Sequence, residues 1–172
     1  MKRIKLTIGL LFALLVCLPA MAQSRFTGRM KAEVVIPISV TESEPLNFGK
    51  LTNNSEGGQV ILSPRSERIN MGGVSGFSND YFAAGRFIVT GSPNHLVTVT
   101  LPQGKRKLYS NTPAQELIVS DFTSDLPVGG QMIPESNGRL DVAIGATLYV
   151  GSWSSSQAGI YSGTYELVFT YN

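Results

Sequence analysis

Apolar and polar residues alternate with a period of two along most of this chain, and this pattern constrains the fold more than any other feature. Every even position in 26–40 is apolar or glycine, and the same alternation returns in 140–150 and 161–171. Side chains of a β-strand point alternately to the two faces of a sheet, so each segment predicts a strand with one buried face. An amphipathic helical stripe is not evident in any segment, and the prediction is an all-β protein.

Shorter runs of β-branched and apolar residues predict further strands, at 59–62, 85–91, 96–101 and 116–122. Ser92-Pro93-Asn94 predicts a turn that makes 85–91 and 96–101 a hairpin. Pro37 cannot donate to a ladder, so the strand over 26–40 is expected at a sheet edge or broken there. About eight strands with Gly, Pro, Asn and Ser between them predict one immunoglobulin-like or pilin-like antiparallel β-sandwich. Loops are expected at 51–58, 72–82, 103–107 and 124–139.

The alternation in 140–150 also predicts which side chains form the core. Asp141 and Thr147 are expected to face away from it. The inward set is Leu140, Val142, Ile144, Leu148 and Val150.

The first 22 residues have the pattern of a secretory signal peptide. Basic residues in 1–5 precede an apolar stretch over 6–19, and Ala20-Met21-Ala22 matches a signal peptidase site. The apolar stretch is too short to span a bilayer, and no second one follows. We therefore expect an exported chain, in the periplasm and then at the cell surface or in an extracellular fibre. It would comprise a single domain over 23–172 with no transmembrane segment.

Cleavage after residue 22 would leave 150 residues without cysteine, because Cys17 is the only cysteine. The domain would then be stable without a disulfide. The remaining chain has 11 basic and 12 acidic side chains, so charge gives no reason to expect binding to nucleic acid. Charged residues are only 15% of the sequence, against about 25% in typical soluble domains, which suits a surface that packs against copies or partners.

The residues needed for catalysis or metal binding are scarce. His95 is the only histidine, and it lies at a predicted turn, where a solvated role is expected. Carboxylates are scattered without the spacing of a calcium loop. We expect no enzyme activity, no cofactor and no metal. Trp153 with Tyr149 and Tyr161 would form an aromatic surface for a sugar, although packing in the core is the favoured interpretation of these rings.

The end of the sequence carries its most specific pattern. Tyr171 is the penultimate residue, and Gly159 is the fourteenth from the end. This resembles the C-terminal signature of chaperone–usher pilus subunits. The chain also resembles short exported bacterial domains of unknown function and the pilin-like domains of the spore coat protein U type. The matching pieces are Pro37-Ile38, Leu46-Asn47-Phe48-Gly49, Gly85-x-Phe87-x-Val89-x-Gly91, Gly145-Ala146-Thr147-Leu148-Tyr149-Val150 and Gly159-Ile160-Tyr161-Ser162-Gly163-Thr164-Tyr165.

The resemblance implies a structural subunit of a surface fibre, pilus or coat. In such subunits a missing strand leaves a groove beside the last strand. A periplasmic chaperone fills this groove before an outer-membrane usher assembles the fibre, and the N-terminal extension of another copy or related subunit then replaces the chaperone. The implied donor segment is 23–30. The implied assembly residues are Phe26, Gly28 and Met30 of the donor and Gly159, Tyr161, Tyr165, Leu167, Phe169 and Tyr171 of the acceptor.

Two features depart from the pilus pattern. Pilus subunits often carry a disulfide, which is missing here, and the alternation of 23–30 continues into the first strand without a break. A self-contained sandwich that binds a carbohydrate or another surface ligand therefore remains an alternative, with the strand around Val34–Val40 lying beside the last one.

Overall fold

The computed structural model describes residues 23–110, 115–134 and 136–172, so the expected signal peptide over 1–22 lies outside the described residues. The chain divides into two compact units, Met1–Val34 and Val35–Asn172. In the first unit, residues 23–34 form no strand, and their side chains are exposed. The prediction of a strand over 26–40 is therefore wrong for residues 26–38. The first strand begins only at Ser39, after Pro37.

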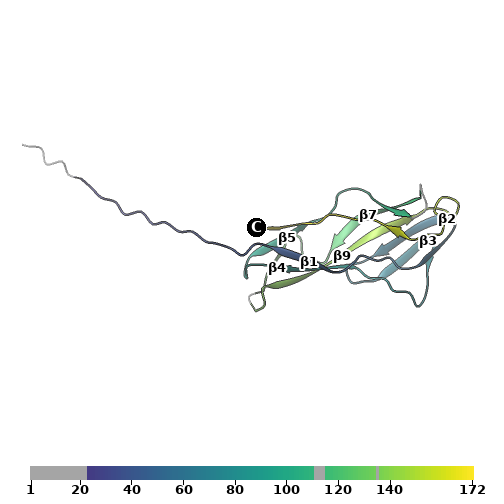
Figure 1. The fold of residues 1–172 in the computed structure, drawn as a ribbon, viewed down its shortest axis with the longest axis horizontal. Coiled ribbons are helices and arrows are strands. Elements are labelled where there is room, and N and C mark those ends of the chain that lie inside the picture. Colours follow the sequence, from purple (N-terminus) through teal and green to yellow (C-terminus); the bar gives the residue numbers. More distant parts are fainter. Residues whose placement is uncertain (1–22, 111–114, 135) are drawn as a thin grey trace, which may run out of the picture. The chain divides into compact units, whose positions relative to one another are not determined.

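Strands build the second unit, and no helix occurs in the described residues (Figure 1). The strands are β1 (Ser39–Glu44), β2 (Leu51–Leu62), β3 (Arg68–Gly76), β4 (Gly85–Thr90), β5 (Leu96–Thr100), β6 (Arg106–Ser110), β7 (Glu116–Ser124), β8 (Gln131–Met132), β9 (Arg139–Val150), β10 (Tyr161–Ser162) and β11 (Val168–Tyr171).

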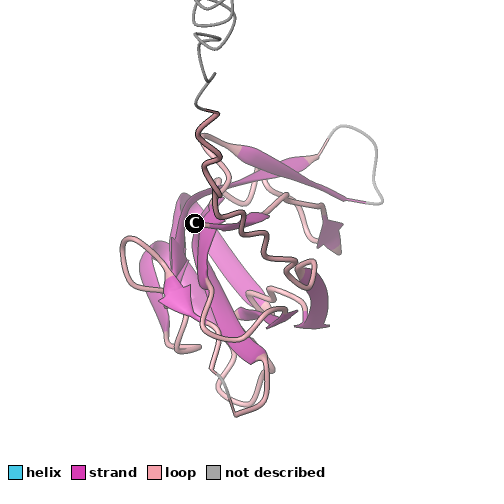
Figure 2. Cartoon of the chain, turned by 90° about the vertical axis from the view of Figure 1, so that its left-hand side faces the viewer, coloured by secondary structure: helices cyan, strands magenta, loops and turns pink. Residues whose placement is uncertain are grey.

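The strands form two antiparallel sheets, which confirms the predicted all-β sandwich (Figure 2). The larger sheet has the order β1-β4-β9-β7-β6-β10, with β2 also paired to β9 and β3 to β2. The smaller sheet has the order β11-β5-β8. On one side, β9 pairs first with β4 and then with β2. At the change of partner lies Gly145, where a Cβ atom would collide with the backbone at the end of β2.

The buried apolar residues form two clusters at the two ends of the domain. The closed-end cluster packs β4 and the first half of β9 against the smaller sheet, and consists of Val89, Val97, Ile133, Leu140, Val142 and Ile144. The open-end cluster comes mainly from the larger sheet, and consists of Phe48, Val60, Leu62, Val74, Leu117, Val119, Ala146, Leu148 and Val150. Figure 1 shows β4 and β5 at one end and β2 and β3 at the other, with β9 between them.

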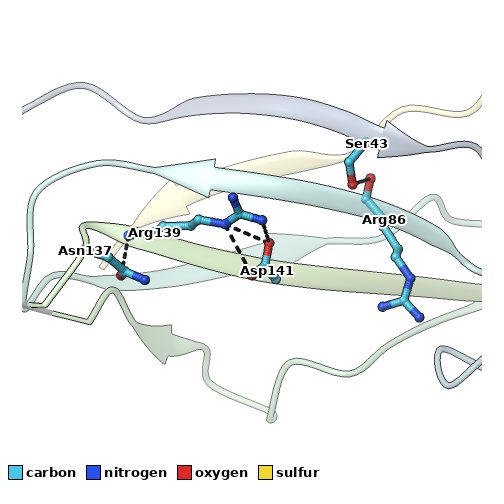
Figure 3. A network of polar contacts seen from close by, with 5 residues as sticks. All are labelled: Ser43, Arg86, Asn137, Arg139 and Asp141. Atoms are coloured by element: carbon cyan, nitrogen blue, oxygen red, sulfur yellow. Dashed lines mark hydrogen bonds and ion pairs between the residues drawn. The ribbon is translucent and has the colours of Figure 1, made fainter.

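The predicted faces of β9 hold with one exception. The five residues predicted to face inward are buried. Asp141 is exposed and forms an ion pair with Arg139 on the surface, as Figure 3 shows. The exception is the solvent exposure of Thr147: it lies on the face opposite to Ala146 and Leu148, as predicted, but it is only 7% exposed and so does not reach the surface. Thr147 pairs with Ile61 of β2 on one side and Ser120 of β7 on the other.

Several predicted connections differ in the structure. The hairpin of 85–91 and 96–101 is wrong, because β4 and β5 lie in different sheets and the turn at Asn94 joins them. The predicted loop over 51–58 belongs to β2, and the loop over 72–82 becomes strand up to Gly76. The single strand predicted over 161–172 divides into β10 in the larger sheet and β11 in the smaller one. Alternation is preserved across such a change of sheet, so the pattern alone does not reveal it.

Candidate assembly groove

A groove lies over the open-end cluster, between residues 46–53 and residues 156–165. Its volume is about 630 Å³. The floor is made of core side chains, Leu117 and Val119 from β7 and Leu148 and Val150 from β9. Leu117 and Val150 remain 7% and 8% exposed there. We call this part the deep section. An occupant of the deep section would touch the hydrophobic core directly.

The groove continues as a shallow section of about 480 Å³. Ile38 and Val40, Phe87 of β4 and residues 165–169 line it. Tyr165 borders both sections, so they adjoin at this residue. The whole groove therefore follows the C-terminal segment from Gly159 to Phe169, with the segment from Ile38 to Asn53 opposite.

The strands beside the groove are sheet edges. In the described part of the chain, β10 pairs with β6 alone and β11 with β5 alone. Residues 163–167 between them belong to no strand. On the opposite side, β1 is the other edge of the larger sheet and pairs with β4. The alternative in which the first strand lies beside the last is therefore wrong for this structure. Unpaired edges of this kind are templates for an added strand.

A buried ion pair holds the wall formed by residues 46–50. Arg68 Nη1 lies 3.6 Å from Asp80 Oδ2, and both side chains are less than one-tenth exposed. Arg68 also donates to the carbonyl of Phe48 at 3.0 Å and lies over the ring of Phe82. Asp80 accepts a hydrogen bond from the backbone N–H of Lys50. Because both charges are paired and hydrogen-bonded, this clamp fixes the wall at a defined distance from β3.

Tyr165 occupies the junction of the two sections. Its ring contacts Phe122 at a centroid distance of 5.3 Å and Phe87 at 6.4 Å. The hydroxyl lies over Gly85, where any Cβ atom would collide with it. This hydroxyl is buried without a hydrogen-bond partner among the described residues, and burial raises the pKa of Tyr165 to about 12. The phenol therefore acts here mainly through its apolar surface.

The structure places the candidate acceptor residues along one wall. Gly159, Tyr161 and Tyr165 line the deep section, and Leu167 and Phe169 line the shallow one. Tyr171 borders neither section and bonds to the backbone of Ile36 and Ser92. The candidate donor residues lie in the segment over 23–34, exposed: Phe26 is 96% and Met30 100% exposed.

Sequence reasoning did not assign the opposite wall to the site. Leu46 and Phe48 line the deep section there, and the only sequence signal named for them is their place in a segment that resembles a known family. Their short apolar alternation just before β2 is the signal that would have indicated a strand-like wall.

The aromatic residues considered for a sugar surface do not come together. Trp153 is 65% exposed, so its placement in the core is wrong. Tyr149 donates to Asp121, and this bond, with one from Ser120, lowers the pKa of the Asp121 carboxyl. Tyr161 donates to the carbonyl of Gln157. Within the described ranges, no ring contact joins these three aromatic residues.

His95 is half-buried at its turn, where the sequence predicts a solvated side chain. Its Nδ1 lies 3.0 Å from the carbonyl oxygen of Pro93, and its ring packs 5.4 Å from that of Tyr171. Over the described ranges, His, Cys, Asp and Glu side chains nowhere gather in a group of three able to hold a metal ion. The same residues contain no helix long and apolar enough to cross a membrane.

Residues 38–171 match the family model of the domain of unknown function DUF4402, and the chain belongs to this family. The match includes both walls of the groove and leaves residues 23–34 outside it. No curated protein and no solved structure matches the chain significantly.

Proposed function

We propose that this member of the DUF4402 family is a structural subunit of a bacterial surface fibre, pilus or coat, and that its copies assemble by β-strand donation. In this proposal, the segment over 23–34 of one copy, here called the arm, occupies the groove of another copy or of a related subunit. An export route through the periplasm, with a chaperone and an outer-membrane usher, belongs to the same proposal. The observation that carries it is the groove, which the edge β10 borders in its deep section over the open-end cluster and the edge β11 borders in its shallow section.

The acceptor side offers both kinds of contact that strand addition uses. Edge backbone groups along β10 and β11 would bond to the main chain of an added strand, and pockets between them would take every second side chain. The floor residues Leu117 and Val150 would lose their remaining exposure to water. Each square ångström of apolar surface buried in this way contributes about 25 cal/mol.

The arm has the chemistry of the complementary strand. Phe26, Met30 and Val34 are all more than nine-tenths exposed, and they share the even positions of the alternation with Gly28. In an extended strand these four positions point to one face. Large apolar side chains exposed together indicate a binding surface. We infer that Phe26 and Met30 fill pockets of the groove and that Gly28 lies where the groove is shallow.

The first experiment compares the chain that begins at Gln23 with the chain that begins at Lys31. We expect the longer chain to form oligomers whose size increases with concentration in sedimentation and light scattering. The shorter chain should stay monomeric and bind a synthetic peptide of residues 23–34. Monomers of both chains across the whole concentration range, without peptide binding, would contradict strand donation.

Matched variants separate the two sides of the interaction. The peptide with Phe26→Asp and Met30→Asp keeps its length and should not bind, because charges would enter an apolar groove. Gly28→Leu should weaken binding by crowding the shallow part. On the acceptor, Val150→Phe should fill the floor and block the peptide while the domain stays folded. Equal binding of all these variants would show that the peptide does not use the groove.

A second candidate function is binding of a carbohydrate by the monomer. Trp153 favours it, because its ring is 65% exposed in a turn that also carries the hydroxyls of Ser152 and Ser155. An exposed indole beside hydroxyl groups is suited to stack on a sugar ring. The test is a glycan array with the shorter chain and its Trp153→Ala variant. Saturable binding by the former and not the latter would establish this function.

A further inference from the structure

Tyr171 forms a hydrogen-bonded connection between the C-terminal strand and the residue from which the arm extends. Its hydroxyl donates to the carbonyl of Ile36 at 2.8 Å and accepts from the backbone N–H of Ser92 at 2.8 Å. The N–H of Ile36 in turn donates to Ser92 Oγ at 2.6 Å. Gly91 leaves the space for this arrangement, since any Cβ atom there would collide with the tyrosine hydroxyl. We call these three residues, Tyr171, Ile36 and Ser92, the latch.

The latch restricts the backbone of Ile36 from both sides. Its N–H and its carbonyl are both bonded, and Pro37 follows it. A residue before proline is held in the extended or polyproline region. Ile36 therefore cannot serve as the bend of a tight turn while the latch is closed. Two residues later, Ile38 already lines the shallow section.

This restriction shortens the part of the arm that can reach the groove of its own domain. To enter the groove of its own domain, the chain would have to reverse before Ile36 and run back beside Ile38 and Val40. A β-turn uses four residues, and with Ile36 fixed these would be residues 32–35. Ala32 and Val34, two apolar positions of the alternation, would then be consumed in the turn. A second copy imposes no such reversal.

We propose that the latch makes the arm a donor to a second copy instead of to its own groove. This inference rests on the proposed function and adds to it the device that keeps the arm out of the groove of its own domain. In this role Tyr171 is a positioning residue, because it acts through Ile36 and contacts neither section of the groove.

The test is Tyr171→Phe in the chain that begins at Gln23, with Tyr109→Phe as the matched control. Tyr109 also carries its hydroxyl on a strand, but it is 58% exposed and lies outside the groove lining. At a dilution where the unaltered protein is monomeric, hydrogen exchange of the arm amides is measured. We expect arm exchange at least about tenfold slower in Tyr171→Phe, because the released arm folds into its own groove, and a smaller share of oligomer at high concentration.

A merely structural role for Tyr171 leaves arm exchange unchanged, because the amides of the exposed arm are already unprotected, and loosening the domain accelerates exchange only within the strands. Pro37→Gly provides a second route to the same release, through an exposed residue next to the latch. It should also slow arm exchange and reduce oligomers, even if Tyr171→Phe fails to fold. Arm exchange and oligomers like those of the unaltered protein in Pro37→Gly and in folded Tyr171→Phe would overturn the inference.

Peptide binding by the chain that begins at Lys31 distinguishes a failure of the latch inference from a failure of the proposed function. If that chain binds the 23–34 peptide and the latch variants behave like the unaltered protein, only the latch inference fails. If that chain does not bind the peptide, strand donation fails and the latch inference fails with it.

Discussion

The two ends of the domain use the same central strand and reach different degrees of closure. At the closed end, Ile144 of β9 is fully buried against the smaller sheet, which supplies Val97. At the open end, Val150 of the same strand remains 8% exposed on the floor of the groove. The alternation of β9 is continuous through both ends. The difference lies in the opposite layer, which β5 and β11 provide at one end and the deep section of the groove replaces at the other.

The two ends of the fold therefore differ in how completely their apolar side chains are buried. At the closed end, the side chains of Val89, Val97, Ile133 and Ile144 are all fully buried. The open end keeps apolar side chains accessible at a cost in stability, as binding sites commonly do. Matched substitutions at the two ends should therefore change the stability of the domain by different amounts.

The largest difference in stability is expected when a buried apolar residue at each end is replaced by aspartate. Ile144→Asp should abolish folding, because an unpaired buried carboxylate costs several kcal/mol, a large part of a typical domain stability of about 5–15 kcal/mol. Leu117→Asp should fold with a loss of about 1–3 kcal/mol, since its carboxylate would reach water in the groove. Urea unfolding followed by circular dichroism measures both. Equal losses would show that the floor is as dry as the closed end.

A smaller effect is expected from the clamp that holds one wall of the open end. Arg68→Ala leaves Asp80 buried without its partner and should cost about 3–5 kcal/mol. Arg139→Ala removes the ion pair drawn in Figure 3, whose side chains are 45% and 68% exposed, and should cost about 0–1 kcal/mol. Urea midpoints of the two variants give the comparison. Similar costs would mean that the clamp does not support the wall.

The smallest effect is expected at the junction between the two sections. Tyr165→Phe removes a buried hydroxyl that lacks a partner in the described part of the chain, and should stabilise the domain by about 1 kcal/mol at pH 8. Burial raises the pKa of Tyr165 from 10.0 to about 12, so the folded state retains this proton while the unfolded state releases it.

The pH dependence of this variant has a definite sign. The stability linked to the Tyr165 proton is complete below pH 10 and is lost as the pH rises from 10 towards 12. Tyr165→Phe lacks this loss, so its advantage over the unaltered protein should increase between pH 9 and pH 11. Urea midpoints across this range measure it. A constant difference would indicate that the phenol is hydrated in the folded state.

Some of the fold and of the candidate site follows from the sequence alone. The alternation of β9 predicts the buried faces of Leu140 and Ile144, because a strand repeats every two residues whatever it pairs with. The resemblance of the pattern from Gly159 to Tyr165 to pilus subunits points to this segment, which lines one wall of the groove.

Pairing between distant segments was decided by the tertiary structure. Asn47 forms a bridge with Ala83, Tyr171 bonds to Ile36 across 135 positions of sequence, and residues 163–167 pass from one sheet to the other. An alternating pattern records which side of a strand is apolar, but it does not record the neighbour that covers that side. The sequence by itself therefore determined an all-β chain with apolar strand faces. Only the packing of distant segments decided that one end is closed and the other is a groove.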